Sequence, residues 1–229
     1  MKKAKKLLVV LLSMMMILAF VGCSKSAPAD EEEGQSGDPL ALVNVEENGD
    51  VSFFCTVNGN WLTGNAAGNK TTRHFIIADD GFNKGKAVLS CIAPAKDVYA
   101  AMIEAGFEPG ARNEEEFTLD NGETLAEGQK INVSLTWTDQ EEPVDMVDCL
   151  LLDNGKRPAI DVYFHGNHAN FEKNYSGCVT CLDSCFVGIT SNAKYGFLNV
   201  EKNNPNILGD ASVLPKAGSV VQVTFSAAK

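Results

Sequence analysis

Three cysteines, Cys178, Cys181 and Cys185, fall within eight residues in the stretch 177–192, which reads GCVTCLDSCFVGITSN. Packing alone does not require cysteines at this density. Thiolates this close together can ligate a metal ion, hold an iron–sulfur cluster, or form one disulfide and leave a free thiol. The stretch is therefore the candidate metal or redox centre of the chain.

Two histidines precede the cysteines and extend the set of possible ligands. His165 and His168 form an H-x2-H pair, and His168 lies ten residues before Cys178. Two imidazoles and three thiolates within 21 residues could supply a tetrahedral zinc site or a copper site. The spacing is not one of the standard zinc patterns. The alternative is that both histidines end a strand over residues 159–164 and bind backbone groups.

The cysteine spacing also matches part of a ferredoxin motif. The three cysteines occupy the last three positions of C-x2-C-x2-C-x3-C-P, but Tyr175 stands in place of the leading cysteine and Phe186 in place of the proline. A fourth ligand for a 4Fe-4S cluster would have to come from Cys55, Cys91 or Cys149. A cluster is therefore less favoured than a single zinc or copper ion.

The beginning of the chain predicts export. Residues 1–22 hold four lysines, then an uncharged apolar run and Gly22, directly before Cys23. This is the pattern of a lipoprotein signal peptide, with cleavage before Cys23 and lipid attached to that residue, as in palmitoylated envelope proteins. Residues 23–40 are acidic and lack large apolar side chains, so we expect a disordered linker. We expect an extracytoplasmic protein held on the bacterial cell membrane through lipidated Cys23.

Export changes the prediction for the cysteines. Without Cys23, six remain, and an even number in an exported protein favours disulfides. Possible partners of the cysteine cluster are Cys55, Cys91 and Cys149. Cys55 and Cys91 both lie on expected strands and could face each other; the alternative is that both are buried thiols, which behave as small apolar side chains. Cys178 and Cys181 also form a C-x-x-C pair that could exchange thiol for disulfide.

Composition limits the partners. The chain has 19 basic and 30 acidic residues; without residues 1–22 it has 15 basic residues and a net charge of −15. Nucleic acid is therefore excluded as a partner on electrostatic grounds. An envelope protein or a small ligand is the expected partner. The sequence has no G-x-S-x-G elbow and no EF-hand pattern, so we expect a non-catalytic protein.

Residues 41–229 predict a single mainly β domain, sandwich-like, with about nine or ten strands and one packed helix. Asn48-Gly49 predicts a hairpin between strands at 41–46 and 51–57. Residues 130–137 alternate apolar and polar side chains, as in a half-buried strand. Further strands are expected at 72–78, 86–92, 147–152, 159–164 and 220–225, the first two joined by a hairpin turn at 79–83. The helix is expected over residues 95–105, between Pro94 and Gly106.

The order of several motifs resembles the YdjY-type domain of bacterial envelope proteins. These motifs are residues 72–81 (TRHFIIADDG), 95–110 (AKDVYAAMIEAGFEPG), 164–167 (FHGN) and 177–192. The resemblance covers about residues 51–192. It implies a shared fold and a ferredoxin-like description based on the cysteine cluster, with little further chemistry.

These patterns together predict a membrane-anchored binding or accessory module whose Cys-rich centre is structural or redox-active. The alternative is an electron-transfer or thiol-redox protein with a metal or iron–sulfur centre at Cys178, Cys181 and Cys185.

Overall fold

The computed structural model describes residues 41–66, 68, 70–111, 123–140, 142–166, 172–200 and 205–229. All of them belong to one compact unit, Ser36–Lys229. The predicted signal peptide, the linker and Cys23 lie outside the described residues. Within the described residues, no helix has the length and apolar character needed to cross a membrane.

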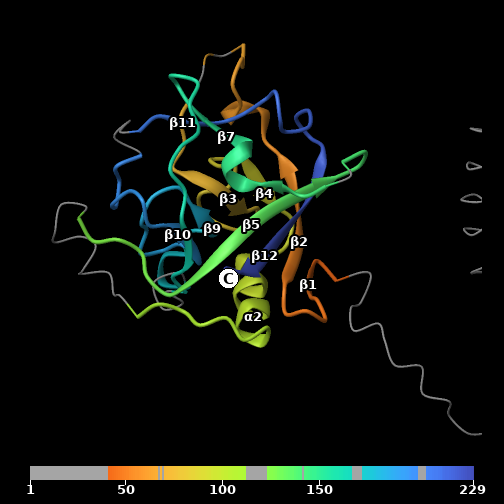
Figure 1. Ribbon diagram of the computed structural model, residues 1–229, viewed down its shortest axis with the longest axis vertical. Helices are drawn as coiled ribbons and strands as arrows, with labels where there is room; N and C mark the ends of the chain where they lie inside the picture. The colour runs from red at the N-terminus through yellow and green to blue at the C-terminus, as the bar shows by residue number, and fades with distance from the viewer. Residues whose placement is uncertain are drawn as a thin grey trace, which may run out of the picture. The chain divides into compact units, whose positions relative to one another are not determined.

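The described strands form a closed barrel of eight strands (Figure 1). Seven pairings lead from β2 to β4, and a direct pairing of β4 with β2 closes the circle, with Cys55 opposite Cys91. The mainly β prediction is confirmed, but the sandwich-like arrangement is wrong because the sheet closes on itself. In barrel order the strands are β2 (Val51–Val57), β12 (Val220–Ala227), β5 (Gln129–Trp137), β8 (Val162–Phe164), β10 (Thr190–Asn192), β9 (Cys178–Cys181), β3 (His74–Ala78) and β4 (Leu89–Cys91).

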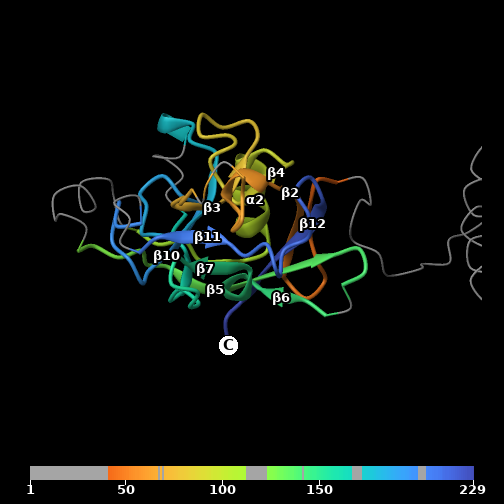
Figure 2. The same cartoon turned by 90° about the horizontal axis from the view of Figure 1, so that it is seen from above.

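Four further short strands lie outside the barrel circle, two of them paired with it and two in a sheet of their own. β1 (Val43–Val45) pairs with β2, and β6 (Val144–Asp145) pairs with β5. β7 (Leu150–Leu152) and β11 (Ile207–Gly209) form a separate antiparallel pair, seen side by side in Figure 2. The β1–β2 hairpin confirms the Asn48-Gly49 prediction, since Gly49 takes a φ of 83°, which favours glycine.

The barrel interior is filled by alternate side chains of its strands. Along β5, Ile131, Val133 and Leu135 are buried and the residues between them are more exposed, which confirms the predicted alternation. Phe53 and Phe225 meet edge to face across β2 and β12, with ring centroids 5.0 Å apart. Burial of these apolar side chains is the main source of the barrel's stability.

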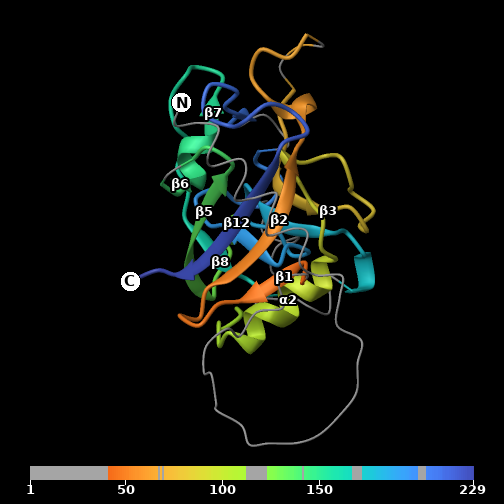
Figure 3. The same ribbon diagram turned by 90° about the vertical axis from the view of Figure 1, so that its right-hand side faces the viewer.

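Helix α2 (Ala95–Glu104) confirms the predicted helix. It starts directly after Pro94 and ends before Gly106, whose φ of 84° stops the helix. Four residues of one face are buried: Ala95, Val98, Ala101 and Met102. That face contacts β1 and β2, and Figure 3 shows the helix beside β1.

Two local predictions were wrong, and the two strands of the cysteine stretch were not predicted. Strands β3 and β4 are parallel, with Ile76 opposite Leu89, so residues 79–88 are a crossover and not a hairpin turn. The expected strand at 147–152 is half 3-10 helix, because residues Met146–Cys149 form η2 before β7 begins. A second 3-10 helix, η1, spans Gly59–Trp61. The cysteine stretch contains two strands, β9 and β10, although its short apolar runs gave no strand signal.

Candidate metal centre

Strands β3 and β9 carry the candidate site on their outer side. They pair antiparallel, with His74 opposite Cys181 and Ile77 opposite Cys178, and the register shifts between these two pairs. In a regular strand, residues three apart point to opposite faces. Here each strand contains one extra residue between these pairs. Residues three apart therefore point to the same face. His74, Cys178 and Cys181 therefore share one face, while Val179 packs into the barrel core.

The three side chains meet in a compact group. His74 Nδ1 lies 3.7 Å from Cys178 Sγ and 3.7 Å from Cys181 Sγ. The three ligand atoms all lie within 4.8 Å of one another, and all three residues are buried. A tetrahedral zinc ion with bonds of about 2.3 Å to sulfur and 2.05 Å to nitrogen holds those atoms about 3.6 Å apart. The group therefore has the spacing of ligands to a single ion.

Hydrogen bonds around the two sulfurs make them unequal. The hydrogen bond with Cys181 lowers the pKa of Cys178 well below its ordinary value, and His74 and Ser176 act in the same direction against the effect of burial. Asn83 Nδ2 also lies 3.9 Å from Cys178 Sγ as a donor. Cys178 and Cys185 both raise the pKa of Cys181, and burial adds to this. Of these two cysteines, Cys178 therefore loses its proton at the lower pH.

Cys185 lies at the edge of the group. It packs in the same small buried cluster as Cys178 and Cys181, and its sulfur hydrogen-bonds with that of Cys181. Its sulfur is not within the 4.8 Å group that includes His74. Cys185 instead lines a neighbouring pocket. It is therefore placed to become a fourth ligand after a small movement, and is not one in this structure.

A buried ion pair fixes the strand ends beside the site. Arg73 Nη2 and Nε donate to Asp183 Oδ1 at 2.7 and 3.2 Å. Burial opposes the charge of Arg73, but Cys185, Asp183 and Cys181 hold its pKa above the ordinary value. Burial raises the pKa of Asp183 to about 6, although Arg73 acts to lower it. Arg73 also places its positive charge beside the thiols of Cys181 and Cys185.

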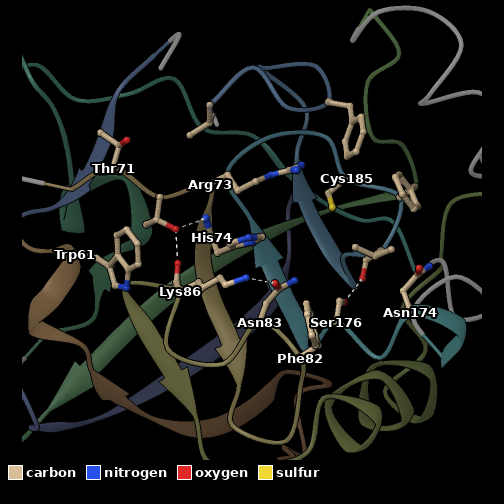
Figure 4. A pocket seen from close by; sticks show the side chains of 15 residues that line it. Trp61, Thr71, Arg73, His74, Phe82, Asn83, Lys86, Asn174, Ser176 and Cys185 are labelled. Atoms are coloured by element: carbon tan, nitrogen blue, oxygen red, sulfur yellow. Dashed lines mark hydrogen bonds between the residues drawn. The ribbon is translucent and has the colours of Figure 1, made fainter. Parts of the chain in front are cut away.

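An open pocket of about 570 Å³ adjoins the group. His74 lines both the pocket and the metal-ligand group, and Cys185 forms part of the wall. Figure 4 shows Trp61 and Lys86 on one side of this pocket and Cys185 on the other, with Arg73 and His74 between them. The pocket therefore borders the candidate metal centre at His74 and Cys185.

Comparison with known proteins identifies the family. The YdjY domain matches residues 42–226. This chain belongs to the YdjY domain family. It is 34% identical over 223 residues to a protein of Escherichia coli (strain K12) named "Uncharacterized protein YdjY", covering 95% of this chain and 93% of the relative. No solved structure matches the chain significantly. The resemblance noted in the motifs is confirmed, and the match extends beyond residues 51–192.

The YdjY domain brings together only part of the predicted ligand set. Cys178 and Cys181 meet as expected, but their histidine partner is His74, not His165. His165 is buried directly after β8 and belongs to no group of three ligand side chains among the described residues. His168 lies outside the described residues. Sequence spacing gave no signal for His74, which is 104 residues from Cys178.

The remaining cysteines of the YdjY domain do not join the centre. Cys55, Cys91, Cys149, Cys178, Cys181 and Cys185 are all buried free thiols, so the predicted disulfides are absent from the described part of the chain. Cys55 and Cys91 do face each other, on β2 and β4. Burial raises the pKa of Cys55 well above its ordinary value and that of Cys149 to about 12. Both stay protonated and pack as small apolar side chains.

Proposed function

We propose that this protein is a non-catalytic, metal-binding module of the bacterial envelope. Its barrel holds one soft transition-metal ion, zinc or copper, between β3 and β9. The observation that carries the proposal is the position of His74 Nδ1, 3.7 Å from the sulfurs of both Cys178 and Cys181. A lipidated Cys23 and export to the outer face of the membrane are part of the proposal, on the basis of the sequence of residues 1–23.

The ligand types suit such an ion. Thiolate and imidazole ligands select zinc and copper over magnesium or calcium, which prefer oxygen. Two thiolates and a neutral imidazole leave a bound Zn²⁺ without net charge, which reduces the desolvation cost of a buried centre. Cys185, which lines the neighbouring pocket, or an external ligand would supply the fourth ligand.

The same spacing argues against an iron–sulfur cluster at these residues. Each cysteine of a 4Fe-4S cluster binds a different iron, so the sulfurs stand farther apart than two ligands of one ion. Cys178 and Cys181 lie in a group only 4.8 Å across. We therefore propose a mononuclear centre in place of a cluster at Cys178, Cys181 and Cys185.

Metal content tests the proposal directly. The full-length protein is purified, loaded with zinc or with Cu⁺ under reducing conditions, dialysed and analysed by mass spectrometry for bound metal. We expect one ion per chain in the parent protein and loss of that ion in His74→Ala and Cys181→Ser. Cys149→Ala is the matched control, because it removes a buried thiol outside the centre, and His165→Ala tests the sequence-predicted ligand.

Several outcomes would overturn the proposal. The first is that the parent protein binds neither zinc nor copper. The second is that Cys149→Ala and Cys181→Ser lose equal amounts of bound metal. The third is that His165→Ala alone among the variants releases the ion. Iron together with acid-labile sulfide would identify a cluster.

A second candidate function is thiol redox exchange, favoured by the lowered pKa of Cys178 beside Cys181. A lowered pKa provides the thiolate that attacks a disulfide. In a metal-free protein, the Cys178 thiolate would attack a partner's disulfide to form a mixed disulfide, and Cys181 would then displace the partner, leaving a Cys178–Cys181 disulfide and two thiols on the partner. Thiol titration before and after mild oxidation separates the two candidates. Loss of two thiols in a protein that binds no metal supports redox exchange, whereas protection of those thiols by zinc supports the metal centre.

A further inference from the structure

The pocket beside the metal centre has a positive lining in an acidic protein. The chain carries a net charge of −11. Yet the described residues that line the pocket include Arg73 and Lys86 and no aspartate or glutamate. Clefts lined by one sign of charge concentrate ligands of the opposite sign. Asp183 balances the charge of Arg73, so Lys86 supplies the excess positive charge of the lining, which favours an anion.

Both cations of the pocket are held against aromatic rings. Lys86 Nζ donates to Asn83 Oδ1 at 2.9 Å and lies 5.4 Å from the centre of the Phe82 ring. The guanidinium carbon of Arg73 lies 4.9 Å from the centre of the Phe197 ring. Cation–π contacts of this kind keep the charged groups in place. The cations are thus positioned before any ligand arrives.

One aromatic ring of the pocket, that of Phe82, is not explained by packing of the domain, whereas Trp61 and Phe197 pack against its buried clusters. Phe82 is 79% exposed, the most exposed of the large apolar side chains of the described residues. Trp61 is fixed at the rim, because its indole N–H donates to the carbonyl of Gly85 at 2.8 Å. Phe186 and Phe197 pack together with ring centres 5.0 Å apart. Exposed aromatic groups around a concave surface mark binding sites.

We propose that this pocket binds a small organic anion with a flat, unsaturated body, such as an aromatic carboxylate. Its charged group lies near Lys86, and its body packs against the rings of Trp61 and the exposed Phe82 (Figure 4). The pocket volume of about 570 Å³ is within the range of small-molecule sites. The site shares only His74 and the candidate fourth ligand Cys185 with the metal centre, and none of the groups that hold the anion is a metal ligand, so the proposal does not depend on a bound ion.

Trp61 gives a direct optical test. The chain has two tryptophans, so full-length protein with Trp137→Phe reports on Trp61 alone. The protein is titrated with 4-nitrobenzoate, a fluorescence quencher, and with the neutral 4-nitrobenzyl alcohol. N-acetyltryptophanamide corrects for collisional quenching. Each titration is repeated after dialysis against EDTA, so that a failure of the metal proposal can be told from a failure of this one.

We expect saturable quenching by 4-nitrobenzoate, with and without EDTA, and weaker binding of the alcohol. Lys86→Met should weaken binding of the anion about threefold to fivefold, as for a solvent-exposed ion pair. It should leave binding of the alcohol unchanged. Lys84→Met is the matched control, since Lys84 is also exposed but does not line the pocket. Phe82→Ala should weaken both compounds.

Three results would overturn the proposal. The first is quenching of Trp61 that does not saturate and matches N-acetyltryptophanamide. The second is equal affinity for the anion and the alcohol. The third is an equal effect of Lys84→Met and Lys86→Met.

Discussion

The Arg73–Asp183 ion pair joins the ends of the two strands that carry the metal centre, and Asp183→Asn is the change that tests its role. Arg73 directly precedes His74, and Asp183 follows Cys181 by two residues. The closest contact, Nη2 to Oδ1, is 2.7 Å, and the side chains are only 11% and 0% exposed. Asparagine keeps the shape of the side chain and removes its charge. The variant therefore leaves Arg73 buried without a counter-charge.

The expected loss of stability is large for one substitution. Removal of one partner of a buried ion pair costs at most about 3–5 kcal/mol in the free energy of unfolding, and relief of the desolvation that raises the pKa of Asp183 offsets part of that cost. A domain of 150–250 residues loses about 2–4 °C in Tm per kcal/mol, so we expect Tm to fall by no more than about 20 °C. The double variant Arg73→Gln/Asp183→Asn leaves no buried charge unpaired. It should therefore lose clearly less stability than the sum of the two single variants.

Guanidinium unfolding followed by circular dichroism measures these differences. The measurement is made at pH 8, because the raised pKa of Asp183, about 6, still leaves the carboxylate ionised there. Asp161→Asn is the matched control, since Asp161 pairs with Lys130 and Lys194 at 2.6 Å each but is more exposed. This control variant should lose no more than about 1 kcal/mol in the free energy of unfolding. A loss in Asp183→Asn no larger than in the control, or strict additivity in the double variant, would refute the reasoning.

Three further predictions concern metal binding, close packing and pH. Zinc at about 100 times its Kd should stabilise the folded protein by about 2.7 kcal/mol; scanning calorimetry should show this rise in Tm for the parent and little for His74→Ala. A Cβ at Gly81 would lie 2.3 Å from the Cα of Gly177, so Gly81→Ala should cost about 1–3 kcal/mol and weaken zinc binding in a competition titration. Gly85→Ala has open space for its Cβ but a φ of 77°, so it should cost stability through backbone strain and leave zinc binding unchanged. Hydrogen bonds from two lysines lower the pKa of Asp161. The contribution of Asp161 to the free energy of unfolding is therefore fully present above the ordinary aspartate pKa and is lost as pH falls through the lowered value. Urea unfolding should therefore show that Asp161→Asn destabilises the protein at pH 7 and no longer does so at pH 2; an equal effect at both would contradict the pairing.

Local sequence patterns predicted the elements that are bounded by turn or cap residues. The hairpin after Val45 follows from Asn48-Gly49, and α2 follows from Pro94 and Gly106, because turn and cap residues act over a few neighbours. The strand β5 follows from its alternation of apolar and polar residues. Strands β9 and β10 were missed because their polar and cysteine side chains are buried, so no alternation marks them.

The sequence by itself determined the mainly β class, the bounds of the helix, the family motifs and the presence of a dense cysteine group. Tertiary structure alone decided that β4 closes the barrel on β2 and that His74, not His165, meets Cys178 and Cys181. The physical reason is that periodicity reports which face of a strand is buried, whereas strand pairing depends on contacts across the whole chain. The register shift between β3 and β9, which turns both cysteines toward His74, is a product of that pairing.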